Sequence, residues 1–308
     1  MKIAYLIQTY KDPELLYRMV NALTPSGDFY ICVDKKTNIK PFVFKLRNYS
    51  NVKFINKRRK INWAGFSVVQ SFLDLLNYAY NQTKEYDRFV FLTGQDYPLM
   101  TNNEILDFFS RHKETEFVMA YNINNSPKAT DKDKVTKKWW FDTPFKNKLL
   151  SRCYKSFFYR FVTKPFTFYS IKVRHNGVEV DPYFGQMLSS FTRNGAQLLL
   201  NTYLNDKVFN NRMRHAHAPD ELYWQTIIFN SLLRKNTVQN GQEHEITEHF
   251  GWAPLHYHNY DVDTSVYTKE DFDELINCGY MFCRKVVPGI SDELMDMIDA
   301  MRKEKENQ

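Results

Sequence analysis

The sequence predicts an α/β fold with a doubly wound, mostly parallel sheet at its centre. Short apolar runs of the kind buried in parallel sheets alternate with helical patterns over residues 1–120. Hydrophobic residues make up 43% of the 308 residues, so a large core is available. The chain has only 10 Gly and 11 Pro, which excludes a fibrous or low-complexity protein.

The first strand–helix–strand unit begins with the apolar run at residues 3–7, which we expect to be a buried strand. Asp12 is placed as the N-cap of the next helix, with Pro13 in its first turn. The apolar residues that follow recur at helical spacing. A second strand is expected at residues 29–33, ending in Asp34. This order is typical of parallel sheets.

The same alternation continues through the rest of this region. Ser67 is expected to cap a helix, and Thr101 with Glu104 fits a capping box at the start of another. Three further strands are expected, at residues 52–55, 89–92 and 117–120.

Ligands of such sheets bind at the carboxyl ends of the strands. The residues there are Gln8, Asp34 and the Gly94-Gln95-Asp96 segment. Neither GxGxxG nor GxxxxGK[ST] occurs, so we expect neither a dinucleotide loop nor a P-loop. On residue type alone, Asp34 fits a nucleoside-binding carboxylate and a turn residue equally well.

Residues 121–180 interrupt the alternation and carry most of the positive charge. Within residues 128–174, thirteen Lys or Arg and three Asp give +10, whereas the whole chain carries +7. A dozen aromatic residues accompany them. We interpret residues 121–180 as a basic, aromatic insertion. Two interpretations stay open: an acceptor-side surface that rests on an anionic membrane, or a solvated face over a subdomain core.

Residues 181–308 are expected to return to regular structure. Helices are expected at residues 194–203 and 220–233, and an amphipathic helix at residues 290–301. Asp220 and Glu221 follow Pro219, where the helix dipole stabilises acids. That preference alone accounts for both carboxylates as structural residues, and a catalytic role is the alternative.

Cysteine spacing and hydropathy indicate a cytoplasmic protein. The four Cys form no CxxC pair, and no apolar run reaches the ~18 residues that cross a membrane. The apolar run at residues 3–7 is shorter than a signal-peptide core. A peripheral position at the inner face of a membrane is compatible with the basic segment.

The histidines do not follow a metal-site pattern. His215 with His217, and His256 with His258, place two imidazoles two residues apart, near a group of Glu and His residues (Glu243, His244, Glu245 and His249). HExxH and Cys–His finger spacings are absent, so no metal site is expected.

Seven segments, in order, resemble the core-2/I-branching β-1,6-N-acetylglucosaminyltransferases and peptide O-xylosyltransferases, which form glycosyltransferase family 14. Residues 121–180 lie outside this resemblance, and the chain looks like a bacterial-type member. The segments are 3–13, 30–34, 61–67, 91–99, 185–193, Pro219-Asp220-Glu221, and 268–285.

The resemblance implies a GT-A-like fold in which residues 1–120 bind a nucleotide sugar and residues 181–308 supply the catalytic and phosphate-binding half. It implies a UDP-sugar donor, inversion at the anomeric carbon, and Glu221 as the catalytic base. Asp220, Gln8 and His256 are supporting residues, and His256 stands where a phosphate-binding Arg is expected. The implied donor-binding residues are Asp34, Trp63, Asp96, Arg284 and Lys285.

A single acid, Asp96, stands where many GT-A enzymes carry DxD, so the resemblance implies catalysis without a metal or other cofactor. Arg284 and Lys285 would offset the leaving diphosphate, although by residue type alone they fit exposed basic residues. Trp63 likewise fits a core residue or a wall of the sugar pocket.

The expected function is transfer of GlcNAc or xylose from a UDP-sugar to a hydroxyl of a glycan or lipid-linked glycan, with no nucleic-acid partner. Two alternatives fit parts of the sequence. The basic aromatic segment suits a nucleic-acid-binding protein, which salt-dependent RNA affinity would reveal. The histidines suit a metal-dependent hydrolase, which stoichiometric zinc would reveal.

Overall fold

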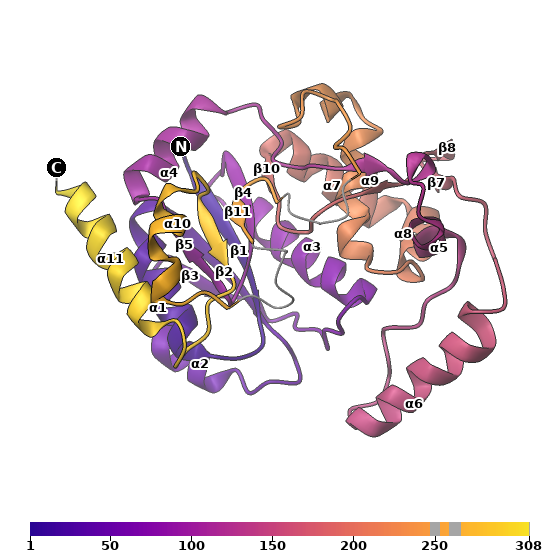
Figure 1. Ribbon diagram of the computed structural model, residues 1–308, viewed down its shortest axis with the longest axis horizontal. Helices are drawn as coiled ribbons and strands as arrows, with labels where there is room; N and C mark the ends of the chain where they lie inside the picture. Colours follow the sequence, from indigo (N-terminus) through magenta and orange to yellow (C-terminus); the bar gives the residue numbers. More distant parts are fainter. Residues whose placement is uncertain (247–252, 259–265, 308) are drawn as a thin grey trace.

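The computed structural model describes residues 1–246, 253–258 and 266–307. Its centre is a five-stranded sheet of order β10-β4-β1-β2-β3, in which only β10 runs antiparallel (Figure 1). The predicted α/β class with a mostly parallel sheet is therefore confirmed. The strands are β1 (Ile3–Thr9), β2 (Gly27–Val33), β3 (Val52–Phe54), β4 (Arg88–Thr93) and β10 (Ser190–Thr192).

Helices cover both faces of this sheet. Alternate residues of β1 enter opposite cores: Tyr5 and Ile7 pack on one face, Ala4 and Leu6 on the other. The first face is covered by α1 (Pro13–Leu23), α2 (Lys40–Leu46), α4 (Asn102–Arg111) and α11 (Asp292–Glu306). The second is covered by α3 (Phe66–Tyr80), α7 (Arg193–Asn205) and α9 (Tyr223–Phe229).

The predicted helix starts differ in how well they match. The Thr101–Glu104 capping box is confirmed: the Glu104 N–H donates to Thr101 Oγ1, and the Thr101 N–H donates to Glu104 Oε2 at 2.7 Å. Asp12 is the N-cap of α1 but makes no side-chain cap bond. Ser67 is not a cap, because α3 already begins at Phe66.

Two predicted elements are wrong. Residues 117–120 form no strand, because β10 takes the place beside β4 and leaves Phe117 a single bridge to Ser190. The helix expected over residues 220–233 is broken into a 3-10 turn at Pro219–Glu221, α9 and a second 3-10 turn. The break follows from Leu222, whose φ of −125° lies outside the helical range.

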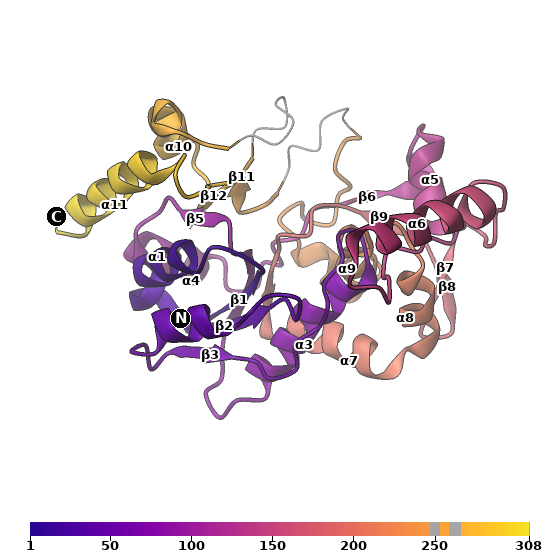
Figure 2. The same cartoon turned by 90° about the horizontal axis from the view of Figure 1, so that it is seen from below.

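Residues 121–180 form a lobe beside the second face (Figure 2). Its α6 projects from the body, and none of its residues is buried. The lobe's elements are β6 (Tyr121–Asn122), α5 (Ala129–Thr136), α6 (Lys148–Phe158), and the β7–β8 hairpin (Val173–His175 and Val178–Val180). The β6 strand pairs with β9 (Tyr183–Phe184), and β7 contacts α8 (Lys207–Arg214).

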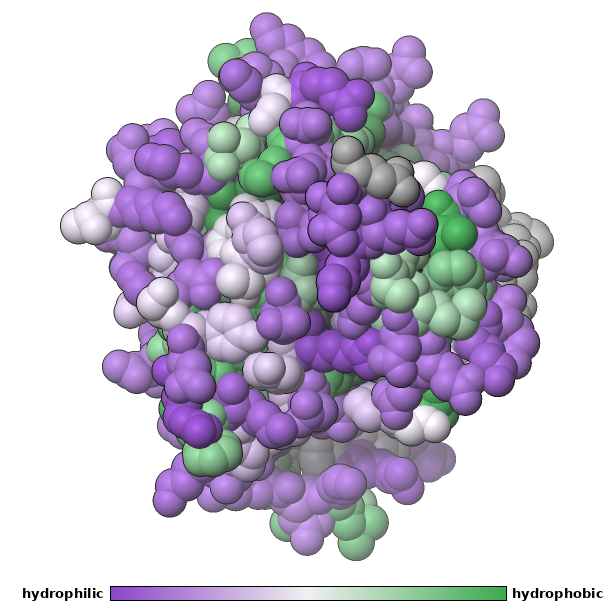
Figure 3. Space-filling model, turned by 90° about the vertical axis from the view of Figure 1, so that its left-hand side faces the viewer, coloured by the Kyte–Doolittle hydropathy of each residue, from purple (hydrophilic) through white to green (hydrophobic). Residues whose placement is uncertain are grey.

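The C-terminal part returns to the N-terminal part. A small sheet joins β11 (His256–Tyr257) and β12 (Phe282–Arg284) to β5 (Asp96–Pro98). After α10 (Phe272–Asn277) and β12, α11 buries Leu294, Met295 and Ile298. Hydrophilic side chains cover much of the face on which α11 lies (Figure 3). Among the described residues, no helix combines the length and apolarity needed to cross a bilayer.

Candidate active site

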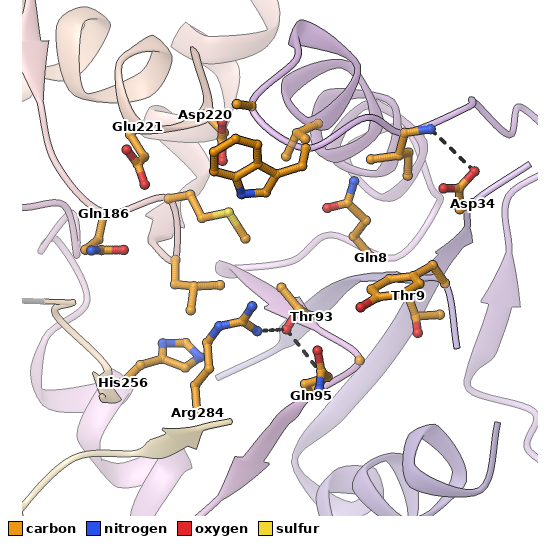
Figure 4. Close-up of a pocket in the computed structure, with 18 of the residues that line it drawn as sticks. Gln8, Thr9, Asp34, Thr93, Gln95, Gln186, Asp220, Glu221, His256 and Arg284 are labelled. Carbon is orange, nitrogen blue, oxygen red and sulfur yellow. Dashed lines mark hydrogen bonds between the residues drawn. The ribbon is translucent and has the colours of Figure 1, made fainter. Parts of the chain in front are cut away.

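A cavity of about 560 Å³ lies at the carboxyl ends of β1, β2 and β4 (Figure 4). This is where the strand order reverses around β1, the usual ligand position in such sheets. Seven of the nine residues predicted for the site line it: Gln8, Asp34, Trp63, Asp220, Glu221, His256 and Arg284. The described lining includes neither Asp96 nor Lys285.

Asp220 and Glu221 lie on one wall of this cavity (Figure 4). They sit on a tight turn rather than in a regular helix. Ala218 enters the turn in the left-handed region, with φ 47°. The Gly185 N–H donates to the Glu221 carbonyl at 2.9 Å and ties the turn to the neighbouring strand end. The backbone therefore fixes both carboxyl groups beside the cavity.

The two carboxyl groups have unusual proton affinity. Burial raises the pKa of Glu221 above its ordinary value, and the adjacent Asp220 raises it further, whereas Lys134 opposes the shift. Burial also raises the pKa of Asp220. Asp220 Oδ1 is buried without a hydrogen-bond partner among the described residues. A carboxylate with a raised pKa is suited to accepting a proton near neutral pH.

Arg284 and His256 form another wall (Figure 4). Arg284 Nη1 donates to Thr93 Oγ1 and lies 2.9 Å from Asp96 Oδ1. His256 Nε2 lies 3.4 Å from Asp96 Oδ2, and its ring stacks on Phe282. Asp96 thus lies behind this wall, hydrogen-bonded to Arg284 and close to the His256 ring.

Asp96 is charged despite complete burial. Burial alone would raise the pKa of its carboxyl, but Arg284, His256 and the Thr93 N–H lower it to about 2. Because both carboxylate oxygens contact protein groups, Asp96 is a positioning residue here. Lys285 follows Arg284, and its carbonyl accepts a bond from the Tyr267 N–H.

Asp34 lies across the cavity from Glu221 in Figure 4. It is only 5% exposed, and its Oδ1 accepts a 2.8 Å bond from the Lys36 N–H. Lys36 Nζ lies 3.3 Å from Oδ2. Gln8 donates to Ser71 Oγ, which fixes its amide at the end of β1. Asp34 therefore combines the expected turn contact with a place on the cavity wall.

Trp63 is not a core residue, since it is 77% exposed at the cavity. Its ring makes edge contacts with Phe141 at 5.9 Å and with His217 at 6.5 Å. Phe141 stacks on Trp139 at 5.8 Å. These rings connect the first cavity to a second one of about 620 Å³ between residues 139–141 and α6.

Asp142 makes a contact with Ser67 that the sequence did not predict. Its carboxylate accepts bonds from the Ser67 N–H at 3.0 Å and the Ser67 hydroxyl at 2.5 Å. It thereby anchors the aromatic segment at the start of α3, beside Trp63. Lys36, Lys134 and the apolar pair Met187 and Leu188 were missed as well, and no local motif marks them.

The described residues contain no group of three or more His, Cys, Asp or Glu placed to hold a metal ion. His249, one of the predicted alternatives, lies outside the described residues. Burial lowers the pKa of His215 and, with Lys134, lowers that of His217 to about 4. Neutral imidazoles at these positions pack among Trp139, Trp140 and Phe141.

Comparison with known proteins identifies a family. The family model "Branch: Core-2/I-Branching enzyme" matches residues 3–276. Human xylosyltransferase 1 is 28% identical over 131 residues, which cover 41% of this chain and 14% of that protein. Xylosyltransferase 2 of Canis lupus familiaris is 30% identical over 134 residues, 41% of this chain and 15% of that protein. The alignments thus span about one seventh of these relatives.

The family match runs across residues 121–180 and stops before β12. Arg284 and Lys285 therefore lie beyond it. Among solved structures, a 4-diphosphocytidyl-2C-methyl-D-erythritol synthase from Anaerococcus prevotii matches with a TM-score of 0.34 and 10% identity, over 67% of this chain and 76% of that one. A similarity this low says nothing about the site.

Proposed function

The chain belongs to the core-2/I-branching enzyme family, and from that premise we propose that it is an inverting, metal-independent glycosyltransferase. The donor is a UDP-sugar, with GlcNAc or xylose as the sugar, and the acceptor is a hydroxyl of a glycan, free or lipid-linked. The observation that carries the proposal is the position of Glu221, on the wall of a cavity whose other walls bear Arg284 and Asp34.

Glu221 is the proposed base. The acceptor O–H gives its proton to the Glu221 carboxylate while the oxygen attacks the anomeric carbon. The bond from that carbon to the diphosphate oxygen breaks, and its electron pair leaves with UDP. One displacement inverts the anomeric centre. A positioned carboxylate contributes about 10²–10⁴-fold to such a step.

Asp220 supports this role through its charge. Asp220 is a close neighbour that raises the pKa of Glu221. Two adjacent carboxylates repel each other, so one of them tends to keep its proton. The free enzyme would then hold Glu221 partly protonated near neutral pH, and the basic form is the one that accepts the acceptor's proton.

Arg284 is the proposed counter-charge for the leaving diphosphate. It already lies on the cavity wall, held by Asp96 and Thr93. A fixed cation stabilises developing negative charge without reorganising during the reaction. Lys285 is proposed to assist it, and Lys36 offers a further cation on the cavity wall.

Asp34 and Gln8 are proposed to contact the nucleoside, because both line the cavity: Asp34 directly follows β2, and Gln8 lies near the end of β1. Trp63 is proposed to wall the sugar pocket, because an exposed indole offers a stacking face. The acceptor would approach along the aromatic rings from Trp63 to Phe141 and Trp139.

A panel of nucleotide sugars tests this proposal. Thermal shift and donor hydrolysis should single out UDP-sugars over GDP- and CMP-sugars, with UDP itself raising the melting temperature. A protein that is stabilised by no nucleotide sugar and hydrolyses none would contradict the assigned donor class.

A further inference from the structure

The α6 helix turns its apolar side chains away from the protein. Its half-buried residues face the body: Phe158 stacks on Trp140 with ring centroids 4.5 Å apart, and Lys155 Nζ lies 5.6 Å from the centre of the Phe141 ring. The second cavity on this inner side is lined by Lys148, Ser151, Arg152 and Lys155. The side of α6 that contacts the rest of the protein therefore includes polar residues.

The outward side of the segment is apolar. Leu149 is 67% exposed, Phe157 57% and Phe161 56%, and Cys153 is exposed as well. These four residues follow one another at intervals of four, so they form one stripe along the helix and its continuing turn. Leu150, 51% exposed, lies beside the stripe. A contiguous stripe of exposed apolar side chains of this kind marks an interaction site.

Basic residues flank this stripe. Exposed cations occur at both ends and along the edge of the helix, and no acid occurs between Thr143 and Lys164. The exposed cations are Lys146, Lys148, Arg152, Arg160 and Lys164. The face thus has an apolar centre and a border whose charged residues are all cations. It complements a partner with anionic groups at its surface and an apolar layer beneath them.

We propose that the outward face of residues 146–164 docks on an anionic lipid bilayer, with α6 lying in the plane of the interface. Eleven residues of helix rise only about 16 Å, well short of a hydrocarbon core about 30 Å thick. An interfacial helix instead gains from buried apolar area and from attraction of Lys and Arg to anionic headgroups.

Charge argues against a second copy of the chain as the occupant. Two copies meeting through this face would bring two sets of five cations together without an acid in either segment. An anionic bilayer supplies the opposite charge and the apolar layer at once. Membrane docking through this face does not depend on which reaction takes place in the first cavity.

Vesicle flotation of the full chain tests the proposal. We expect recovery with vesicles of phosphatidylcholine plus phosphatidylglycerol, little recovery with phosphatidylcholine alone, and a loss between low and moderate salt. The double variant Phe157→Ser/Phe161→Ser should reduce partitioning at least tenfold. Reversing Arg160 and Lys164, two exposed cations that line neither cavity, to Glu should reduce it about fivefold or more per residue.

Matched controls separate this face from general surface change. Leu204→Ser/Leu232→Ser removes two exposed apolar side chains elsewhere, and Lys113→Glu/Lys303→Glu reverses two exposed charges elsewhere. Both should float like the original chain. UDP-induced thermal shift should be unchanged in all four double variants, so membrane binding and donor binding are read separately.

Two results would overturn the proposal. One is equal recovery of the chain with neutral and anionic vesicles. The other is a lipid-free dimer in sedimentation that becomes monomeric in Phe157→Ser/Phe161→Ser, which would assign the face to contact between copies.

Discussion

Asp96 Oδ1 lies 2.9 Å from Nη1 of Arg284, and the two residues are directly paired across β5 and β12. They are 188 positions apart in the chain. The pair joins the end of the N-terminal half to the C-terminal segment and fixes the guanidinium on the cavity wall. An acid conspicuous in the sequence therefore acts on the site through the basic residue that it holds.

Asp96→Asn should lower the free energy of unfolding by about 2–4 kcal/mol, because it removes the negative charge that compensates the partly buried Arg284 guanidinium. Urea unfolding at neutral pH measures this loss. Asp107→Asn, an exposed acid on α4, serves as the control and should change little. Equal stability of the Asp96 variant and the original chain would remove the pair from its structural role.

Arg284→Ala should weaken UDP binding by about 1.5–3 kcal/mol, the usual scale for hydrogen bonds to charged groups. Lys285→Ala should weaken it by a similar amount if both cations reach the diphosphate. Isothermal titration with UDP measures both. Unchanged affinity in the Arg284 variant would contradict its assignment, and unchanged affinity in the Lys285 variant alone would leave Arg284 as the main contact.

Turnover should persist in EDTA, because fixed cations rather than a metal offset the charge of the leaving diphosphate. A donor-hydrolysis assay with and without EDTA and added manganese measures this. Complete dependence on manganese would refute metal independence. Asp96 would then be the first residue to test as a ligand, although its oxygens are bonded to Thr93 and Arg284 here.

The parallel strands were predictable because buried runs such as residues 3–7 leave little choice of structure. The strand at residues 117–120 failed because its place beside β4 is taken by residues 190–192, a long-range pairing that no local pattern records. The prediction of a helix over residues 220–233 was wrong because Asp220 and Glu221 lie on a tight turn that begins at Pro219. The spacing of apolar residues does not reveal such a turn.

Much of the lining of the candidate site was predictable from strand ends and motifs. Gln8, Asp34 and Glu221 were found in this way, and they line one cavity. Contacts that depend on tertiary packing were not predictable. Asp142 anchors on Ser67 from 75 positions away, and Lys134 influences Glu221 from within a segment that the motifs do not cover.

Glu221→Gln should change how stability depends on pH. An unfolded Glu has a pKa near 4.3, and burial beside Asp220 raises the pKa of Glu221 in the folded chain. Between these values the folded state binds more protons, so its relative stability falls as pH rises through the window. The Gln variant lacks this loss and should exceed the original chain in stability above the window.

Urea unfolding of both proteins from pH 4 to pH 9 measures this difference. Below the unfolded pKa the two should have similar stability. A difference that does not grow with pH would show that the Glu221 carboxyl ionises as readily in the folded chain as in the unfolded one.

The most direct test of the base assignment is single-turnover sugar transfer by Glu221→Gln, using the UDP-sugar that the donor panel identifies. Gln keeps the size of the side chain but accepts no proton, so transfer should fall about 10²-fold or more while UDP affinity stays within twofold of the original chain. Glu304→Gln, on the exposed side of α11, should transfer sugar at the original rate. Near-normal transfer by the folded Glu221 variant would contradict its assignment as the base.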